Sequence, residues 1–114
     1  MSRRTTNLLP QISFSVLLAL SLKPRHGYEL MKQIEQDSTG LVKIGPGALY
    51  GTIKQLHEEG LIEELADSDN GRRRYYRLTS EGKKRLGAEL SYFESTVKLA
   101  QQRRLLNEAI AGAI

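Results

Sequence analysis

A mainly α-helical fold with one small β-hairpin is predicted by three features of this 114-residue sequence. Apolar residues recur at helical spacing through residues 46–60 and again through residues 80–100. The pair Asn70-Gly71 separates two strand-like runs, which is the strongest short-range signal for a hairpin. A crowded apolar segment at residues 8–22 supplies material for a core. A chain of this length forms one domain, and the order of its elements predicts a winged helix-turn-helix followed by a C-terminal dimerisation helix.

The first predicted helix, residues 8–22, is apolar on nearly every face. It must therefore be buried on more than one side, and a partner subunit is the expected second cover. The polar residues 1–7 before it form a flexible N-terminal tail. The run 23–27 contains Pro24 and ends the helix.

Two further helices complete the helix-turn-helix. The first runs from about Tyr28 to Ser38, and an extended link at residues 41–44 follows it. In the second helix Pro46 suits the first helical position, because its missing N–H would be unpaired there anyway. Gly60 can take the left-handed conformation that closes this helix.

The helix at residues 46–60 is the predicted recognition helix. Leu49, Ile53 and Leu56 form its buried stripe. Its other face carries small, hydrogen-bonding or basic residues and no acid before Glu58: Ala48, Gly51, Thr52, Lys54 and Gln55. A face free of bulk and of negative charge can approach an anionic, grooved surface.

The hairpin is the expected wing. Its strands are predicted at residues 61–67 and 72–79. Because side chains alternate along a strand, Tyr76 and Leu78 share one face, which we assign to the core. The opposite face carries Arg73, Tyr75 and Arg77.

The last helix, capped by Thr79 or Ser80, carries two apolar ridges. The first ridge is a seam with steps of four, three, four and three residues: Leu86, Leu90, Phe93, Val97 and Ala100. The second ridge consists of Tyr92, Leu99 and Leu106. Three helices and a hairpin cannot cover both ridges, so the seam predicts a homodimer. The expected organisation is a tail at 1–7, a DNA-binding domain at 8–79, and a dimerisation helix with an apolar tail at 80–114.

The net charge of +4 and the pI near 9.5 favour a polyanionic partner. The basic residues gather beside the predicted turn: Arg72, Arg73, Arg74 and Arg77. These arginines have two interpretations. They pair across the hairpin with the preceding acidic run, or they contact phosphates or the minor groove of DNA. Four arginines exceed what cross-strand pairing needs, which favours DNA contact.

Tyrosines and lysines near the recognition helix are further candidates for DNA contact. Tyr28 and Tyr50 are either core aromatics with a hydroxyl at the surface or donors to phosphate. Tyr75 shares a strand face with arginines, which favours contact. Lys43 and Lys54 flank the recognition helix and are either solvated or within reach of phosphates.

The sequence argues against an enzyme. His26 and His57 lack zinc-ligand spacing, there is no Gly-x-Ser-x-Gly motif, and no Gly-Lys-Ser/Thr follows Gly45-Pro46-Gly47 as in a phosphate loop. We expect no catalytic residue, no cofactor and no metal. The absence of cysteine, of a bilayer-long apolar run and of a signal-peptide pattern leads us to expect a cytoplasmic protein.

Four segments carry a more specific signal: His26-Gly27-Tyr28-Glu29-Leu30, Gly47-Ala48-Leu49-Tyr50, Leu56 to Ile62, and Gly71 to Gly82. Together they resemble the PadR family of bacterial transcriptional regulators, in its short form with a single C-terminal dimerisation helix. The resemblance implies a homodimer with a winged helix-turn-helix in each subunit, which usually represses its own or a neighbouring operon. It also implies that a small aromatic or cationic compound relieves repression at the dimer interface.

The resemblance also assigns residues. The DNA-facing positions of the family fall on Tyr28, Gly47, Tyr50, Thr52, Lys54 and the wing arginines Arg72 to Arg74. Some small members bind flat drugs through a tryptophan in the last helix, and this chain has no tryptophan. The candidate effector-binding residues are Phe14, Tyr92 and Phe93, of which Phe93 also fits the dimer seam.

We therefore expect a sequence-specific regulator of double-stranded DNA, acting as a homodimeric repressor on an inverted-repeat operator. The candidate DNA-binding residues are Tyr28, Lys43, Gly47, Ala48, Tyr50, Gly51, Thr52, Lys54, Arg72, Arg73, Arg74 and Tyr75. The alternative is a winged-helix module that binds a protein and no DNA, through the acidic run from Glu58 to Asp69 and the apolar tail.

Overall fold

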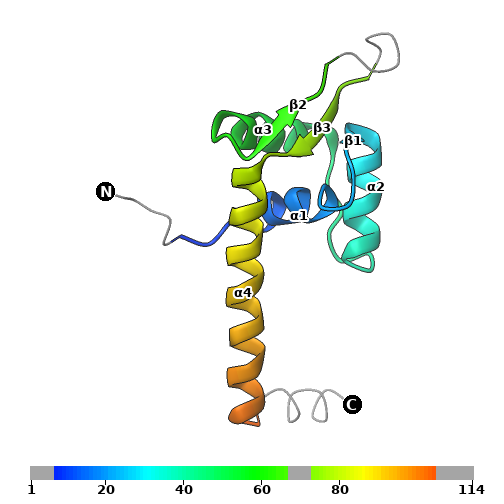
Figure 1. Cartoon of the computed structure of the whole chain (residues 1–114). Helices are drawn as coiled ribbons and strands as arrows, with labels where there is room; N and C mark the ends of the chain where they lie inside the picture. The colour runs from blue at the N-terminus through cyan, green and yellow to red at the C-terminus, as the bar shows by residue number, and fades with distance from the viewer. Residues whose placement is uncertain (1–6, 67–72, 105–114) are drawn as a thin grey trace.

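The computed structural model describes residues 7–66 and 73–104. Its elements follow in the order α1 (Gln11–Ala19), β1 (Arg25–His26), α2 (Gly27–Asp37), α3 (Pro46–Glu58), β2 (Ile62–Glu64), β3 (Tyr75–Leu78) and α4 (Ser80–Gln102). The mainly α-helical fold with a β-hairpin is confirmed, and a third strand joins the hairpin. Figure 1 shows α3 and the hairpin together at one end of the molecule, with α4 projecting away from that end.

Helix α1 lies at the centre of the hydrophobic core. It packs against α2, α3 and α4, and its Val16 and Leu17 are fully buried. The prediction that this helix is buried on more than one side is confirmed within a single subunit. It begins at Gln11 rather than Leu8, because Pro10 disfavours a helical conformation at the residue before it.

The helices of the helix-turn-helix lie where the sequence predicts them, and their ends have clear causes. His26 Nδ1 accepts a hydrogen bond from the Glu29 amide at 3.4 Å, and the Glu29 carboxylate accepts one from the His26 amide at 3.2 Å. This reciprocal capping box starts α2. Pro46 lies in the first turn of α3, and Gly60 beyond its end has a left-handed backbone with φ of 78°.

The sheet contains a strand that the sequence analysis missed. Its strands are antiparallel in the order β1-β3-β2. The sequence indicates only a helix break at 23–27, but Arg25 and His26 pair there with Tyr76 and Tyr75. A strand of two residues is too short to show alternation, so the pattern could not reveal it.

The hairpin has the predicted faces. Ile62 lies opposite Leu78 in the register of β2 and β3, and Tyr76 and Leu78 are both buried, as predicted. Both strands are shorter than predicted. The tip at residues 67–72, which includes the predicted turn and Arg72, lies outside the described residues.

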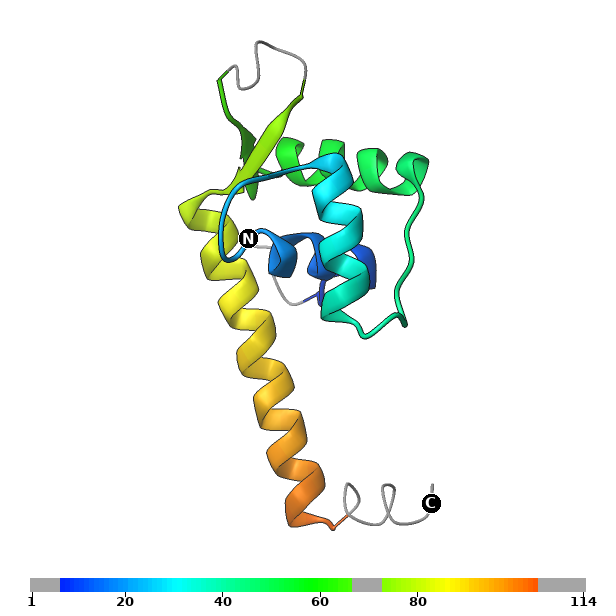
Figure 2. The same ribbon diagram turned by 90° about the vertical axis from the view of Figure 1, so that its right-hand side faces the viewer.

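Helix α4 begins at a side-chain cap. The hydroxyl of Thr79 accepts a hydrogen bond from the Gly82 amide at 3.0 Å, which selects Thr79 between the two predicted caps. Beyond its first turns the helix leaves the domain and projects alone (Figure 2). Leu106 and the apolar tail lie outside the described residues. No helix within the described ranges combines the length and the apolar composition needed to cross a bilayer.

Two hydrogen bonds fasten the segment before α1 to α4. A guanidinium nitrogen of Arg85 donates to the carbonyl of Asn7 at 2.8 Å. The amide of Leu9 donates to the carboxylate of Glu89 at 3.0 Å. Glu89 is almost wholly buried, so this hydrogen bond satisfies one of its two carboxylate oxygens in place of water.

Gly82 lies where α4 passes close to the backbone of Leu61. A Cβ at Gly82 would overlap the Leu61 carbonyl oxygen. We predict that Gly82→Ala lowers the free energy of unfolding by about 2–3 kcal/mol in urea denaturation, because two pieces of backbone must separate. Gly87→Ala is the matched control: a Cβ there meets no atom within 4 Å, and its helix propensity should add about 0.5–1 kcal/mol. Similar losses for both variants would contradict this close approach.

Candidate nucleic-acid interface

The exposed face of α3 carries two glycines that the fold does not require. Gly47 and Gly51 are exposed, and a Cβ at either one would meet no atom within 4 Å. Neither has a positive φ. Because glycine inside a helix costs about 1 kcal/mol relative to alanine, neither packing nor backbone conformation explains them. They leave the α3 backbone open to close approach from outside.

The other α3 candidates flank these glycines. Ala48 and Lys54 are exposed, and Thr52 is half-buried. Lys43 is exposed in the link before the helix. Among the described residues, no acidic partner is found for either lysine.

Tyr50 lies at the surface rather than in the core. Its side chain is about half exposed, and its hydroxyl packs against Gly27 at the start of α2, where a Cβ would overlap it. Because Gly27 has no side chain, the Tyr50 side chain can pack against the first turn of α2. The hydroxyl consequently reaches the junction of α2, α3 and β3.

A shallow hollow of about 530 Å³ lies at this junction. It is lined by His26, Gly27, Tyr28, Tyr50, Arg73, Arg74 and Tyr76, and we refer to it as the wing hollow. None of these lining residues is acidic, and Tyr28 is largely exposed at its edge. Burial, and then the negative charge of Glu64, raise the pKa of the Tyr76 hydroxyl, so Tyr76 remains a hydrogen-bond donor at neutral pH.

The wing arginines differ in their partners. Arg77 donates to the Glu63 carboxylate at 2.6 Å, and Arg74 lies 3.8 Å from that of Glu64. Cross-strand pairing, one of the two interpretations of the arginine block, therefore accounts for these two residues. Exposed pairs of this kind contribute only about 0–1 kcal/mol, so Arg74, which is mostly exposed, can exchange its partner.

Arg73 has a different neighbour from the other wing arginines. Its Nη1 lies 3.3 Å from Nε2 of His26, and no ion pair joins it to an acid within the described ranges. The rings of Tyr75 and His26 are nearly perpendicular, with a centroid distance of 5.2 Å. Arg72, the fourth arginine, lies outside the described residues.

Two residues at this surface escaped the sequence analysis. Lys32 places its ammonium 5.4 Å from the centroid of the Tyr28 ring, and their i, i+4 spacing on the predicted helix was a usable signal. His26 was assigned to a helix break, yet it caps α2 and faces Arg73. Only the pairing of β1 with β3 brings these two residues together, so no local pattern indicates it.

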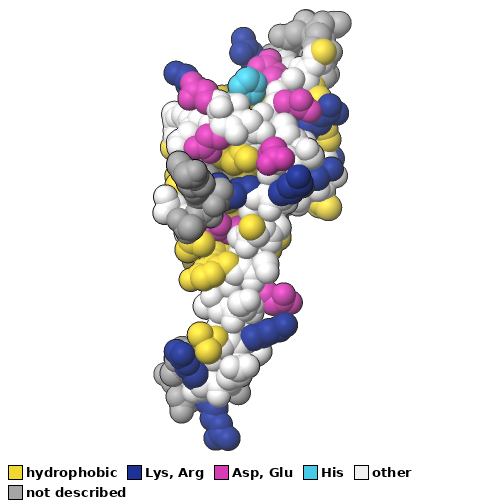
Figure 3. All heavy atoms as spheres, turned by 60° about the vertical axis from the view of Figure 1, so that its left-hand side comes forward, with side chains coloured by type: hydrophobic (Ala, Val, Ile, Leu, Met, Phe, Trp, Pro, Cys, Tyr) yellow, Lys and Arg dark blue, Asp and Glu magenta, His cyan; other side chains and the backbone are white. Residues whose placement is uncertain are grey.

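The candidate dimerisation and effector residues lie on α1 and α4, away from the α3 face. Leu86 is buried in its own domain, Ala100 is half-buried, and Leu90, Phe93 and Val97 are about two-fifths exposed or more. Figure 3 shows apolar side chains gathered on one side of α4 where it leaves the domain.

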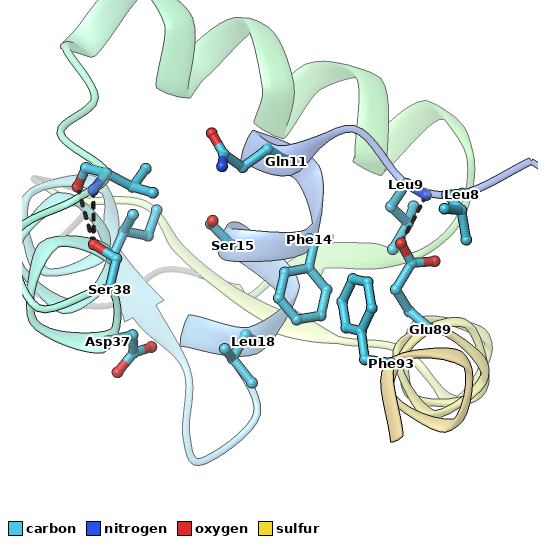
Figure 4. Close-up of a pocket in the computed structure, with 12 residues that line it drawn as sticks. Leu8, Leu9, Gln11, Phe14, Ser15, Leu18, Asp37, Ser38, Glu89 and Phe93 are labelled. Carbon is cyan, nitrogen blue, oxygen red and sulfur yellow. Dashed lines mark hydrogen bonds between the residues drawn. The ribbon is translucent and has the colours of Figure 1, made fainter. Parts of the chain in front are cut away.

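A groove of about 410 Å³ lies between α1, the end of α2 and α4. Phe14 and Phe93 line it and meet edge to face, with ring centroids 5.2 Å apart (Figure 4). The Tyr92 ring lies 5.7 Å from the Phe93 ring but does not line the groove. The structure thus brings the three candidate effector residues together. Within the described ranges, no group of three or more His, Cys, Asp and Glu side chains is arranged to hold a metal ion.

Comparison with known proteins gives the same classification as the motifs. The model of the transcriptional regulator PadR-like family matches residues 16–88. The chain is 38% identical over 72 residues to the uncharacterized protein X of Lysinibacillus sphaericus, which covers 60% of this chain and 66% of that protein. It is 33% identical over 72 residues to the transcriptional regulator YqjI of Escherichia coli, which covers 63% and 34%. The chain thus spans less than two thirds of the length of these relatives.

Solved structures agree with this result. A transcriptional regulator from Clostridium thermocellum superposes with a TM-score of 0.68 at 28% identity, over 80% of this chain and 87% of the other. A PadR family transcription regulator from Clostridium difficile gives 0.68 at 27% identity, over 82% and 97%. The predicted resemblance and fold class are confirmed.

Proposed function

The chain belongs to the PadR-like family of transcriptional regulators, and from this premise we propose that it is a homodimeric repressor in the cytoplasm that binds an inverted-repeat operator. The family implies a DNA-binding regulator. The operator symmetry, the sign of control and the residues at the interface are our proposal.

The exposed face of α3 that contains Gly47 and Gly51 is the observation that most strongly supports the DNA-binding assignment. Two exposed glycines that the fold does not need give a smooth surface to a helix at the same end of the molecule as the hairpin (Figure 1). The major groove, about 12 Å wide, admits one α-helix. In this proposal Gly47, Ala48, Gly51 and Thr52 approach the base edges.

The surrounding polar side chains are proposed to hold the DNA backbone. Phosphate contacts set the position of a protein on the duplex, whereas base contacts give specificity. The wing supplies Arg72, Arg73, Arg74 and Tyr75, and the helices and the link supply Tyr28, Lys43, Tyr50 and Lys54. Lys32, beside Tyr28, extends this set along α2.

A second copy of the chain is the proposed cover for the apolar side of α4. Leu90, Phe93 and Val97 are exposed on a helix that projects from its own domain. A two-fold pair of such helices would bury these residues and place two α3 helices on successive turns of DNA, about 34–36 Å apart. The groove between α1 and α4 would then lie at the subunit interface, and we propose that it takes a small aromatic or cationic effector against Phe14 and Phe93, with Tyr92 beside Phe93 at its edge.

The proposal is tested by selecting genomic fragments with the purified protein. We expect the bound fragments to share an inverted repeat with half-sites about one helical turn, or a multiple of it, apart. Binding weaker than about 10⁻⁶ M to every fragment at physiological salt would favour the protein-interaction alternative instead.

Gly51→Ala distinguishes the contribution of Gly51 to the stability of α3 from its contribution to DNA binding. We predict a rise of about 0.5–1 kcal/mol in the free energy of unfolding, together with weaker binding to the selected operator, because the added methyl group lies on the face that meets DNA. Denaturation and anisotropy titration measure the two quantities. Gly87→Ala, on α4, should raise stability equally and leave DNA binding unchanged. Unchanged operator affinity in Gly51→Ala would argue against α3 as the recognition helix.

Val97→Glu tests the dimer. A carboxylate in the apolar seam should be buried unpaired on association, so we expect the mass measured by light scattering to fall toward that of one chain. Ser91→Glu adds the same charge on the exposed face of α4 that carries Lys84 and Lys98 and should leave the dimer intact. A Val97→Glu protein that still has twice the chain mass would refute this interface.

A further inference from the structure

His26 is a nearly buried histidine that faces two donors at once. Its Nδ1 accepts the amide of Glu29 at 3.4 Å, and its Nε2 lies 3.3 Å from Nη1 of Arg73. The carboxylate of Glu29 is 3.6 Å from Nε2, which exceeds a hydrogen bond. The side chain is only 10% exposed, so water can replace few of these contacts.

In this arrangement the hydrogen-bonding groups around His26 are not all paired. A neutral imidazole has one acceptor nitrogen and one N–H. If Nδ1 caps α2, the proton is on Nε2, and two N–H groups, from His26 and Arg73, point into the same space. Within the described ranges, no acceptor lies at hydrogen-bond distance from Nε2. The pair therefore lacks a shared acceptor.

The space in front of this pair is the wing hollow. Its other polar groups are the hydroxyls of Tyr28, Tyr50 and Tyr76 and the guanidinium of Arg74. Glu29 of α2 lies beside His26, and Glu64 of β2 lies beside Arg74, but neither lines the hollow. Two guanidinium groups and tyrosine hydroxyls around a cavity without a carboxylate fit an oxyanion with several acceptors, such as a phosphate.

We propose that the wing hollow binds a phosphate of the DNA backbone between His26 and Arg73, and that His26 takes up a proton when it does so. This inference rests on the proposed DNA-binding function and adds a regulatory property to it. Without DNA, a charge on His26 would face the guanidinium of Arg73, and among the described residues Glu29 is the one acid paired with His26 that would offset that repulsion. A phosphate between the two cations replaces the repulsion by attraction to both, so it stabilises the charged imidazole.

The sign of the pH dependence follows from this uptake. If the complex holds more protons than the free components, acid favours the complex. Histidine ordinarily changes its charge between about pH 5 and pH 8. Uptake of one proton changes the dissociation constant at most tenfold per pH unit, and we expect binding to tighten about fivefold between about pH 8 and pH 6.

The test compares three proteins on one mixed-sequence DNA duplex at constant ionic strength across this pH range. His26→Asn keeps a side-chain oxygen that can cap α2 and removes the titrating ring. His57→Asn removes the other histidine, which is exposed on α3. We expect wild type and His57→Asn to tighten about fivefold as pH falls, whereas His26→Asn stays nearly flat. Equal pH dependence in wild type and His26→Asn overturns this inference and leaves the proposed function standing; absence of wild-type binding at every pH overturns the proposed function itself.

A measurement on the unaltered protein removes any dependence on how the variants fold. The ring resonances of His26, followed by NMR near neutral pH, should move toward the charged form when the duplex is added. Inorganic phosphate, added instead, should cause the same shift at higher concentration, because it offers the same oxygens without the rest of the duplex. Resonances that move with inorganic phosphate but not with the duplex would identify a site for a free anion and overturn the proposal.

Discussion

Burial of α1 is the constraint on which the rest of the structure depends. Val16 and Leu17 of α1, the helix that packs against α2, α3 and α4, are inaccessible to solvent. Removing each such side chain from water is worth about 1.5–3 kcal/mol. Because one helix contacts the other three, it fixes α3, the proposed recognition helix, relative to α4, the helix proposed to form the dimer. A rearrangement of one therefore changes the packing available to the other.

Glycine serves two opposite purposes in this fold. At Gly82 and Gly27 the missing side chain lets two parts of the chain approach: α4 reaches the Leu61 carbonyl, and Tyr50 reaches α2. At Gly47 and Gly51 nothing in the protein occupies the free space. The first pair stabilises the fold, whereas the second costs helix propensity and leaves a surface open. A helix that gives up stability on its exposed face is typical of a surface used for binding.

The charges of the wing are distributed rather than uniform. Glu63 holds Arg77 closely, Glu64 faces Arg74 at longer range, and Arg73 turns to His26. The number of arginines in the wing is therefore larger than the number of positive charges that are free of an acidic partner and available to a phosphate. Among the described residues, Arg73 forms no ion pair with an acid and lies beside the nearly buried His26. Proton binding and DNA binding are therefore expected to be linked at this place.

The sequence by itself determined the fold class, the three helices that precede the hairpin and the faces of the hairpin. These follow from local causes: the apolar stripe through Leu49, Pro46 at the start of α3 and strand alternation at Tyr76. Only the tertiary structure decided which residues share a site. The pairing of β1 with β3 brings His26 into contact with Arg73, which lies 47 positions away in the sequence. The absence of a side chain at Gly27 lets the Tyr50 hydroxyl pack against it. Contacts between distant segments produce no periodic pattern in the sequence. Their geometry is set by packing around α1 and not by the sequence neighbours of each contacting residue.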